Sequence, residues 1–431
     1  MFHNRLVAAV FSAVIAMAPA MAQTFKTTFV SLRTGANGVL YEPTTPGAKS
    51  AVGIVYTHFG GNNLSHPSGP QLAERGYRVF LLNHYAKWIG FEGITPPISE
   101  AIKYVRQVQG IQKVVLLSHS GGGPLVTLYQ NIAENGPKVC QGPEKLYPCK
   151  GNLKGLPKAD GLILLDSHLG TGFQQLTYTD PANRSDMWPT DRDPFLDMFD
   201  LKNGFDTTRR IGTYSGEFAH RFFSAQGARN ERIIEHAKWR LAQIAQGKSE
   251  YRDDEPFVVP ASQEARLLQA DPRILSHTHA PHPLLKADGT TPVQIVPSVR
   301  PSLITNRATV GSLQSAQVTT VRNFLATHAL RTTSDYGMTE DSITGIDWAS
   351  SSTSSISNIE GVTVPTLIVA MSCHYFLVPD EMIFDHSAAK DKQYALVEGA
   401  SHVFSPCRPE FGDTQKRLFD YVDRWLSRPG Q

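Results

Sequence analysis

A serine lies where the chain is expected to turn from a buried strand into a helix. Residues 113–117, KVVLL, predict the strand, and residues 124–135 have helical length with Gly136 at their end. Between them stands SHSGG, residues 118–122. The small residues two places before and after Ser120 allow a strained turn that would hold its hydroxyl above the sheet edge as a nucleophile. The simpler alternative is an ordinary junction in which Ser120 caps the helix.

A histidine far along the chain could act as the base for this hydroxyl. His402 follows a predicted strand, residues 393–397, in the sequence EGASH. An imidazole beside a serine hydroxyl can accept its proton, which is the chemistry of acyl transfer. A single loop histidine is more often solvated than catalytic, so the assignment depends on a fold that brings the two residues together.

The segments around these residues alternate between strands and helices, which predicts an α/β fold. We expect a mostly parallel eight-stranded sheet with helices on both faces. The carboxyl ends of parallel strands share one edge, so His58, Ser120 and Asp166 should gather on one rim. The predicted strands are residues 25–32, 38–42, 51–58, 77–83, 113–117, 159–166, 364–371 and 393–397, and the predicted helices are 68–76, 98–109, 124–135, 379–388 and 414–427.

The SHSGG, EGASH and HFGG (58–61) segments resemble the α/β-hydrolase superfamily. Its nucleophile motif is G-x-S-x-G, and Ser118 stands here in place of the first glycine. The resemblance implies that Ser120 is the nucleophile and His402 the base. It also implies an oxyanion hole made by the backbone N–H groups of Phe59 and Gly121, with Gly60 as the second choice for Phe59.

The acid departs from the commonest pattern of the superfamily. Many members carry an aspartate after the seventh strand, where this chain has Tyr375. Another position known in the superfamily follows the sixth strand, where Asp166 stands, and we expect Asp166 to orient His402. Asp380 and Asp385 are the reserve candidates. Asp166 could instead be a structural residue whose carboxylate accepts backbone N–H groups.

The chain is expected to be exported and to consist of a core with one large insertion. Residues 1–22 have the features of a signal peptide cleaved near Ala22, which places the protein in the periplasm or outside the cell. The core would comprise residues 23–170 and 362–431. The resemblance implies that residues 171–361 form a cap inserted after the sixth strand. We expect this cap to be mainly helical, with helices at 231–246 and 313–330 and a hairpin at 282–299.

The four cysteines are expected to form disulfides, because export permits them. Cys140 and Cys149 bracket a short loop. Cys373 and Cys407 lie just after two predicted strands, and a bond between them would brace the loop that carries His402. Of the three possible connectivities, pairing Cys140 with Cys149 and Cys373 with Cys407 is therefore the expected one.

The composition excludes several classes of partner. The 431 residues have a net charge of +2 and no basic run, so nothing favours nucleic acid or an anionic membrane surface. No later segment is long enough to span a membrane. No phosphate-binding or dinucleotide motif is present, so no cofactor is expected. The spacing of His277, His279 and His282 matches no zinc pattern, and we expect a solvated loop and no metal there.

The sequence therefore predicts an exported serine hydrolase that acts on a small-molecule carboxylic ester or lactone. Ser120, His402 and Asp166 would form the triad, and the reaction would pass through an acyl-enzyme. The alternatives are an amidase, other chemistry on the same fold such as perhydrolysis or lyase action, or a non-catalytic binding protein on an α/β-hydrolase scaffold. The natural substrate and the oligomeric state stay open.

Overall fold

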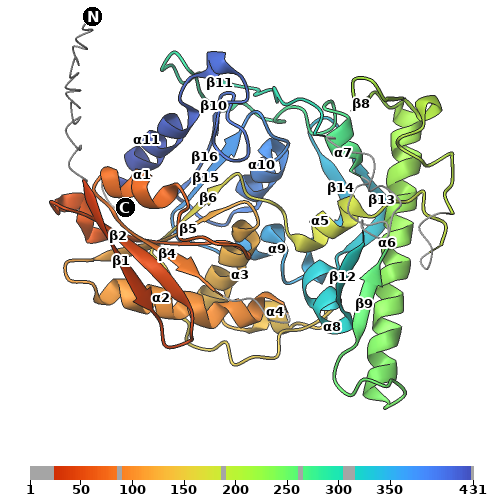
Figure 1. Ribbon diagram of the computed structural model, residues 1–431, viewed down its shortest axis with the longest axis horizontal. Helices are drawn as coiled ribbons and strands as arrows, with labels where there is room; N and C mark the ends of the chain where they lie inside the picture. Colours follow the sequence, from red (N-terminus) through yellow and green to blue (C-terminus); the bar gives the residue numbers. More distant parts are fainter. Residues whose placement is uncertain (1–23, 85–89, 186–190, 261–265, 304–315, 429–431) are drawn as a thin grey trace, which may run out of the picture.

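A computed structural model describes residues 24–84, 90–185, 191–260, 266–303 and 316–428. The predicted signal peptide lies outside these residues. The core is one ten-stranded sheet in the order β1-β2-β4-β3-β5-β6-β15-β16-β10-β11 (Figure 1). Its strands are β1 Phe25–Ser31, β2 Asn37–Pro43, β3 Val52–Thr57, β4 Arg78–Asn83, β5 Lys113–His119, β6 Gly161–Leu165, β10 His282–Leu285, β11 Val293–Gln294, β15 Thr366–Met371 and β16 Lys392–Val397.

Most of the sheet is parallel, as the sequence predicts. The seven strands β4, β3, β5, β6, β15, β16 and β10 run parallel to one another, and the antiparallel pairs β1-β2, β2-β4 and β10-β11 lie at the two edges. Every residue of β6 and β15 is buried, which explains why these strands are continuous apolar runs without alternation. All eight expected strands are present within a residue or two of their predicted ends.

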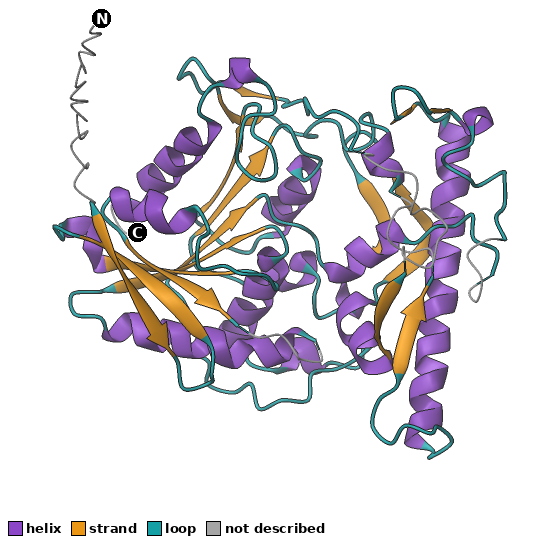
Figure 2. Ribbon diagram, in the orientation of Figure 1, coloured by secondary structure: helices purple, strands orange, loops and turns teal. Residues whose placement is uncertain are grey.

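Helices cover both faces of this sheet (Figures 1 and 2). Ile54 and Tyr56 of β3 point to the face that α1 and α11 cover, and Val55 points to the opposite face. Because successive strand residues alternate sides, an inner strand such as β3 supplies side chains to both hydrophobic cores. The covering helices are α1 Ser68–Glu74 and α11 Thr414–Leu426 on one face, and α2 Thr95–Gln107, α3 Gly122–Asn135, α9 Ser355–Ile359 and α10 Leu377–His386 on the other.

The long segment between β6 and α9 contains more strand than the mainly helical cap that we expected. The 30-residue α6, Gly216–Ala245, is its longest element and lies away from the main sheet (Figure 1). Three two-stranded sheets accompany it, β7-β8, β9-β12 and β13-β14. Its remaining elements are α5 Thr171–Tyr178, β7 Phe205–Asp206, β8 Ile211–Gly212, β9 Pro256–Val259, α7 Leu267–Ala270, β12 Gln317–Thr320, α8 Val321–Asn323, a π-helix Phe324–His328, β13 Arg331–Met338 and β14 Ile343–Asp347.

One expectation for this segment is wrong, and another is confirmed but in an unexpected place. The helix expected over residues 313–330 is replaced by β12, α8 and the π-helix in its described part, because residues 317–320 pair with β9. The predicted hairpin at 282–299 forms as β10 and β11, but it extends the main sheet next to β16, which raises the strand count from eight to ten. The division of the chain into core and cap at residues 170 and 361 stays a prediction.

Short helices and disulfides complete the fold. Both disulfides form as predicted, Cys140–Cys149 and Cys373–Cys407. None of the described helices combines the length and the apolar character that crossing a membrane requires. The short helices are Ala48–Ala51, Phe91–Ile94, Lys138–Gln141 (α4), Leu201–Asn203, Trp348–Ser350 and Pro409–Phe411.

Candidate active site

Ser120 occupies a strained turn between β5 and α3. Its backbone φ is +53°, in the left-handed region that costs a non-glycine residue about 1–2 kcal/mol. The turn is held by hydrogen bonds from the Ser120 N–H to the carbonyl of Leu165 and from the Gly123 N–H to the carbonyl of Ser120, both 3.1 Å long. Gly122 is needed because a Cβ there would lie 2.6 Å from the carbonyl oxygen of Thr57. The sequence thus folds locally to present the Ser120 hydroxyl.

His402 reaches this hydroxyl from the loop after β16. Its Nε2 lies 2.9 Å from Ser120 Oγ, within hydrogen-bond distance. Its Nδ1 lies 2.5 Å from Oδ2 of Asp166, on the opposite side of the ring. The carbonyl of His402 accepts a hydrogen bond of 2.8 Å from the ring of His119, which fixes the loop backbone. One imidazole therefore bridges a hydroxyl and a carboxylate.

Asp166 follows β6 and is fully buried. It also has a left-handed backbone, with φ of +43°. Its Oδ1 accepts the Met371 N–H at 3.2 Å, so the carboxylate is tied to the end of β15. Burial acts to raise its pKa, but the imidazole of His374, followed by that of His402, outweighs burial and holds the pKa of Asp166 well below its usual range. The carboxylate is therefore ionised at neutral pH.

The reserve acid Asp380 lies close by but makes a different contact. It is buried in the first turn of α10, and its Oδ1 accepts the Ser167 N–H at 3.1 Å. Burial and then the nearby charge of Asp166 raise the pKa of Asp380 well above its usual value, so it is protonated. Asp385 pairs instead with His279. Of the three candidate acids, only Asp166 contacts His402 in the described part of the chain.

The order of these residues along the chain identifies the fold. A serine sits at a strained strand-to-helix elbow, an aspartate follows the next strand of the sheet, and a histidine follows a later strand, in the chain order Ser, Asp, His. The chain has the α/β-hydrolase fold.

Comparison with solved structures gives neighbours at low sequence identity. A hormone-sensitive lipase from a metagenome library is 12% identical, with a TM-score of 0.42 over 94% of this chain and 86% of that one. The bacterial brefeldin A esterase is 12% identical, with a TM-score of 0.42 over 96% and 80%. The α/β hydrolase GrgF from Penicillium sp. sh18 is 10% identical, with a TM-score of 0.41 over 94% and 98%. No protein-family model and no curated protein matches the sequence.

The backbone of Phe59 lies beside that of Gly121 at the elbow. A Cβ built on Gly121 would lie 3.8 Å from the Cβ of Phe59, so the two backbone segments are adjacent. Gly60 and Gly61, in the loop after β3, both have positive φ, a conformation that favours glycine. The N–H groups of Phe59 and Gly121 donate to no described residue. Both amides are therefore available to an oxyanion.

His374 is a site residue that our sequence analysis missed. Its Nδ1 lies 2.8 Å from Asp166 Oδ2, the same oxygen that His402 approaches, and its ring centroid lies 4.5 Å from that of His402. It stands directly before Tyr375, in the loop where many α/β-hydrolases carry the acid. The signal that could have identified His374 was its position just after the seventh strand. That loop lacks the aspartate of the commonest pattern, so no site residue was predicted there.

Asp166, His374 and His402 are also the one group of described residues close enough together to consider as metal ligands. Two ligands of a tetrahedral zinc ion, each about 2.0–2.2 Å from it, lie about 3.3 Å apart. The 2.5 Å separation of His402 Nδ1 and Asp166 Oδ2 is much shorter. The geometry fits a shared proton and does not fit a metal ion.

A small cavity opens beside Ser120 and His402. Its volume is about 190 Å³, and every side chain that lines it is uncharged or an imidazole. The walls come from the start of the long insertion, from α7 and from the loop between β15 and α10. The lining residues are Ser120, His168, Phe173, Gln174, Thr177, Tyr178, Gln269, His374, Tyr375, Phe376 and His402.

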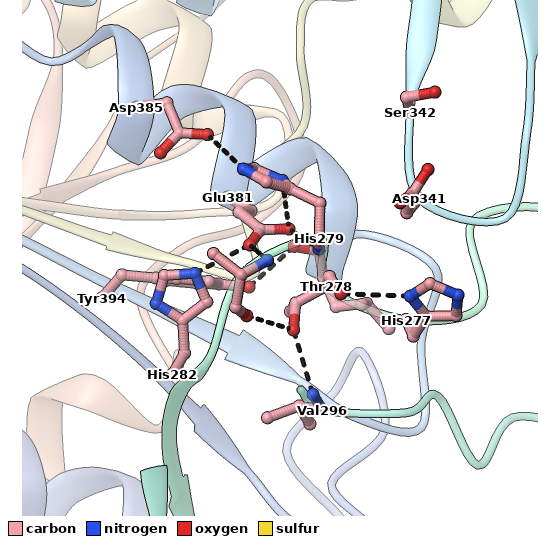
Figure 3. A network of polar contacts seen from close by, with 12 residues as sticks. His277, Thr278, His279, His282, Val296, Asp341, Ser342, Glu381, Asp385 and Tyr394 are labelled. Carbon is pink, nitrogen blue, oxygen red and sulfur yellow. Dashed lines mark hydrogen bonds and ion pairs between the residues drawn. The ribbon is translucent and has the colours of Figure 1, made fainter. Parts of the chain in front are cut away.

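The histidines of the HTHAPH segment (277–282) lie outside this cavity, and their expected solvation is wrong in part. His279 and His282 contact the buried carboxylate of Glu381 on α10, whereas the ring of His277 lies 3.0 Å from the carbonyl oxygen of Thr278 (Figure 3). His282 Nε2 lies 2.7 Å from Glu381, and the N–H groups of His279 and Ala280 donate to it at 2.9 and 3.0 Å. The segment therefore anchors α10, the helix that follows the cavity wall.

Proposed function

We propose that this α/β-hydrolase is an exported serine hydrolase that cleaves carboxylic esters or lactones. The observation that supports it best is the double contact of His402, with Ser120 Oγ at 2.9 Å and Asp166 Oδ2 at 2.5 Å. That arrangement provides a nucleophile, a base and a group that fixes the tautomer of the base.

In the proposed reaction, Ser120 Oγ attacks the ester carbonyl while His402 Nε2 takes the hydroxyl proton. The N–H groups of Phe59 and Gly121 stabilise the tetrahedral oxyanion. His402 then gives the proton to the leaving alcohol, which leaves an acyl group on Ser120. A water molecule, deprotonated by His402, attacks this acyl-enzyme and releases the carboxylic acid, and the proton returns to Ser120. The ionised Asp166 stabilises the imidazolium in both halves of the reaction.

Export is part of this proposal. All four cysteines are paired, which suits an oxidising compartment. Secreted protein that lacks residues 1–22 by intact mass would support export.

The proposal is tested with p-nitrophenyl esters of graded acyl length. We expect turnover by the wild type and a loss of at least about 10⁴-fold in kcat for Ser120→Ala. Ser118→Ala is the matched control, because this neighbouring serine points into the core and its Oγ has no hydrogen-bond partner among the described residues. Turnover that survives in Ser120→Ala would contradict the proposal. Faster cleavage of matched p-nitroanilides would favour an amidase, and folded but inert protein a binding function.

A further inference from the structure

Two tyrosines line the cavity beside Ser120. Tyr178 lies at the end of α5, and Tyr375 lies in the loop between β15 and α10. Burial raises the pKa of Tyr375 far above neutral, so its proton is present. Where these two protons point determines which substrate group the cavity can bind.

The Tyr178 hydroxyl accepts a hydrogen bond from a glutamine. Gln174 Nε2 donates to it at 3.0 Å. The neighbouring ring of His168 in the cavity wall is neutral, because burial lowers its pKa to about 4. The Gly170 N–H donates to His168 Nδ1 at 2.9 Å, so Nδ1 is unprotonated and the ring carries its proton on Nε2.

Two hydrogen bonds determine the direction of the Tyr375 hydroxyl. Arg266 Nη1 donates to Gln269 Oε1 at 3.1 Å, and a guanidinium has no acceptor. The orientation of the Gln269 amide is thereby fixed, and its Nε2 donates to the Tyr375 hydroxyl at 3.3 Å. Both tyrosine oxygens are thus acceptors from a glutamine, and each proton must be donated elsewhere. The described residues supply no acceptor for either proton.

Positive charge lies behind both phenol rings. The guanidinium carbon of Arg266 is 3.7 Å from the centroid of the Tyr178 ring, and that of Arg300 is 5.7 Å from the centroid of the Tyr375 ring. A cation at a ring face polarises the phenol and strengthens its O–H group as a donor. The cavity wall itself carries no charged group that could pair with a buried carboxylate. The two donors therefore suit an uncharged oxygen acceptor.

We propose that Tyr178 and Tyr375 bind a second carbonyl oxygen of the substrate, so that the enzyme selects uncharged diesters and keto esters over plain esters. This inference rests on the proposed function, and it specifies the substrate class. The cavity volume of about 190 Å³ equals that of about six waters at roughly 30 Å³ each, which suits a side group of about seven non-hydrogen atoms.

The test compares esters that match in length and differ in the second carbonyl. Diethyl succinate is compared with ethyl heptanoate for a carbonyl on the acyl side, and ethylene glycol diacetate with pentyl acetate for one on the alcohol side. Hydrolysis is followed by pH-stat. We expect kcat/KM of at least one diester to exceed that of its partner by about tenfold or more, because two hydrogen bonds are gained. Monoethyl succinate, which carries a carboxylate, should be cleaved more slowly than diethyl succinate.

Two variants assign the preference to the tyrosines. Tyr178→Phe and Tyr375→Phe should each reduce the diester-to-monoester ratio of kcat/KM by about threefold to tenfold. Tyr336→Phe is the matched control, because this buried hydroxyl donates to Gln226 within the insertion. A ratio near one in the wild type, a ratio unchanged in both variants, or faster cleavage of monoethyl succinate would overturn the proposal.

Failure of the proposed function would look different, because all the esters would then resist hydrolysis. The same pairs are therefore also compared for binding to Ser120→Ala by saturation-transfer NMR, which needs no turnover. Stronger binding of a diester that Tyr178→Phe or Tyr375→Phe abolishes supports the donor pair. Equal binding of diester and monoester overturns it.

Discussion

Two imidazoles approach one carboxylate oxygen at the centre of this molecule. His402 and His374 lie 2.5 and 2.8 Å from Asp166 Oδ2, and burial excludes water from that carboxylate. An ionised carboxylate in a buried position is stable only when such partners surround it. His374 therefore supports the charge that orients His402, and it does so from the loop where the superfamily usually supplies the acid itself.

At the residue scale, the assignment of Asp166 as the acid predicts how one substitution changes kcat. Asp166→Asn should lower kcat by about 10⁴-fold, because an amide cannot hold His402 in the tautomer that accepts the Ser120 proton. Asp380→Asn is the matched control. Asp380 is already protonated, so an asparagine of the same shape keeps its contact with the Ser167 N–H and should change kcat by less than about threefold. Steady-state kinetics on both variants decide the question, and the reverse order of effects would make Asp380 the acid.

Sequence could predict the site residues only where a local motif carries them. Ser120 and His402 stand in recognisable loops, and the structure brings their side chains together. Asp166 shared its assignment with two alternatives, because an aspartate after a strand has no distinctive local pattern. His374 and the tyrosine pair were not predicted. Their roles depend on contacts with residues distant in the chain, such as Asp166 and Gln269, which no local pattern records.

At the element scale, buried strands were predictable and short paired strands were not. A continuous apolar run such as β15 predicts a buried strand, because both faces of such a strand are covered. β12 has three partly exposed residues and one exposed residue, and it is stabilised by pairing with β9, about sixty positions earlier. Its local pattern predicted a helix. β10 joins the main sheet by pairing with β16, more than a hundred positions later. Its position in the sheet could therefore not be predicted from the local sequence either.

The Cys373–Cys407 disulfide joins two of the loops that form the site. It links the loop of His374 and Tyr375 to the loop of His402, and a hydrogen bond from the Cys373 N–H to the Ala400 carbonyl lies beside it. Replacing both cysteines with serine should lower the free energy of unfolding by about 2–4 kcal/mol. It should also lower kcat, because His402 loses its brace. Urea unfolding and steady-state kinetics measure the two effects.

The other disulfide is the control for this prediction. Cys140–Cys149 lies beyond the end of α3 that is farthest from Ser120, so replacing it should reduce stability and leave kcat within about twofold. If the two double variants have the same kcat, the Cys373–Cys407 bond does not brace the site.

At the scale of the whole molecule, buried neutral histidines make stability depend on pH. Burial lowers the pKa of His66 to about 3 and the pKa values of His168 and His328 to about 4. In the unfolded chain each would titrate near 6.5. Between pH 6.5 and 4 the unfolded state therefore binds more protons than the native state, and the free energy of unfolding falls as the pH falls.

We expect each such histidine to contribute about 1.4 kcal/mol per pH unit to this decline below pH 6. The lowered pKa of Asp166 adds nothing in that range, because its stabilisation is lost only below the pKa near 3.9 of an unfolded aspartate. Urea unfolding at pH 7, 6 and 5 measures how steeply the free energy of unfolding falls with pH. His328→Leu should reduce this dependence by the contribution of one histidine, about 1.4 kcal/mol per pH unit. A free energy of unfolding that is constant or rises on acidification would contradict this prediction.

The central claim is that the Ser120 hydroxyl is an activated nucleophile, and covalent trapping tests it most directly. The folded protein is treated with a fluorophosphonate, and the adduct is located by peptide mass spectrometry. We predict stoichiometric labelling of Ser120, no adduct in Ser120→Ala, and labelling at least about 10³-fold slower in His402→Ala. Folded wild-type protein that stays unlabelled, or an adduct on another residue, would contradict the account.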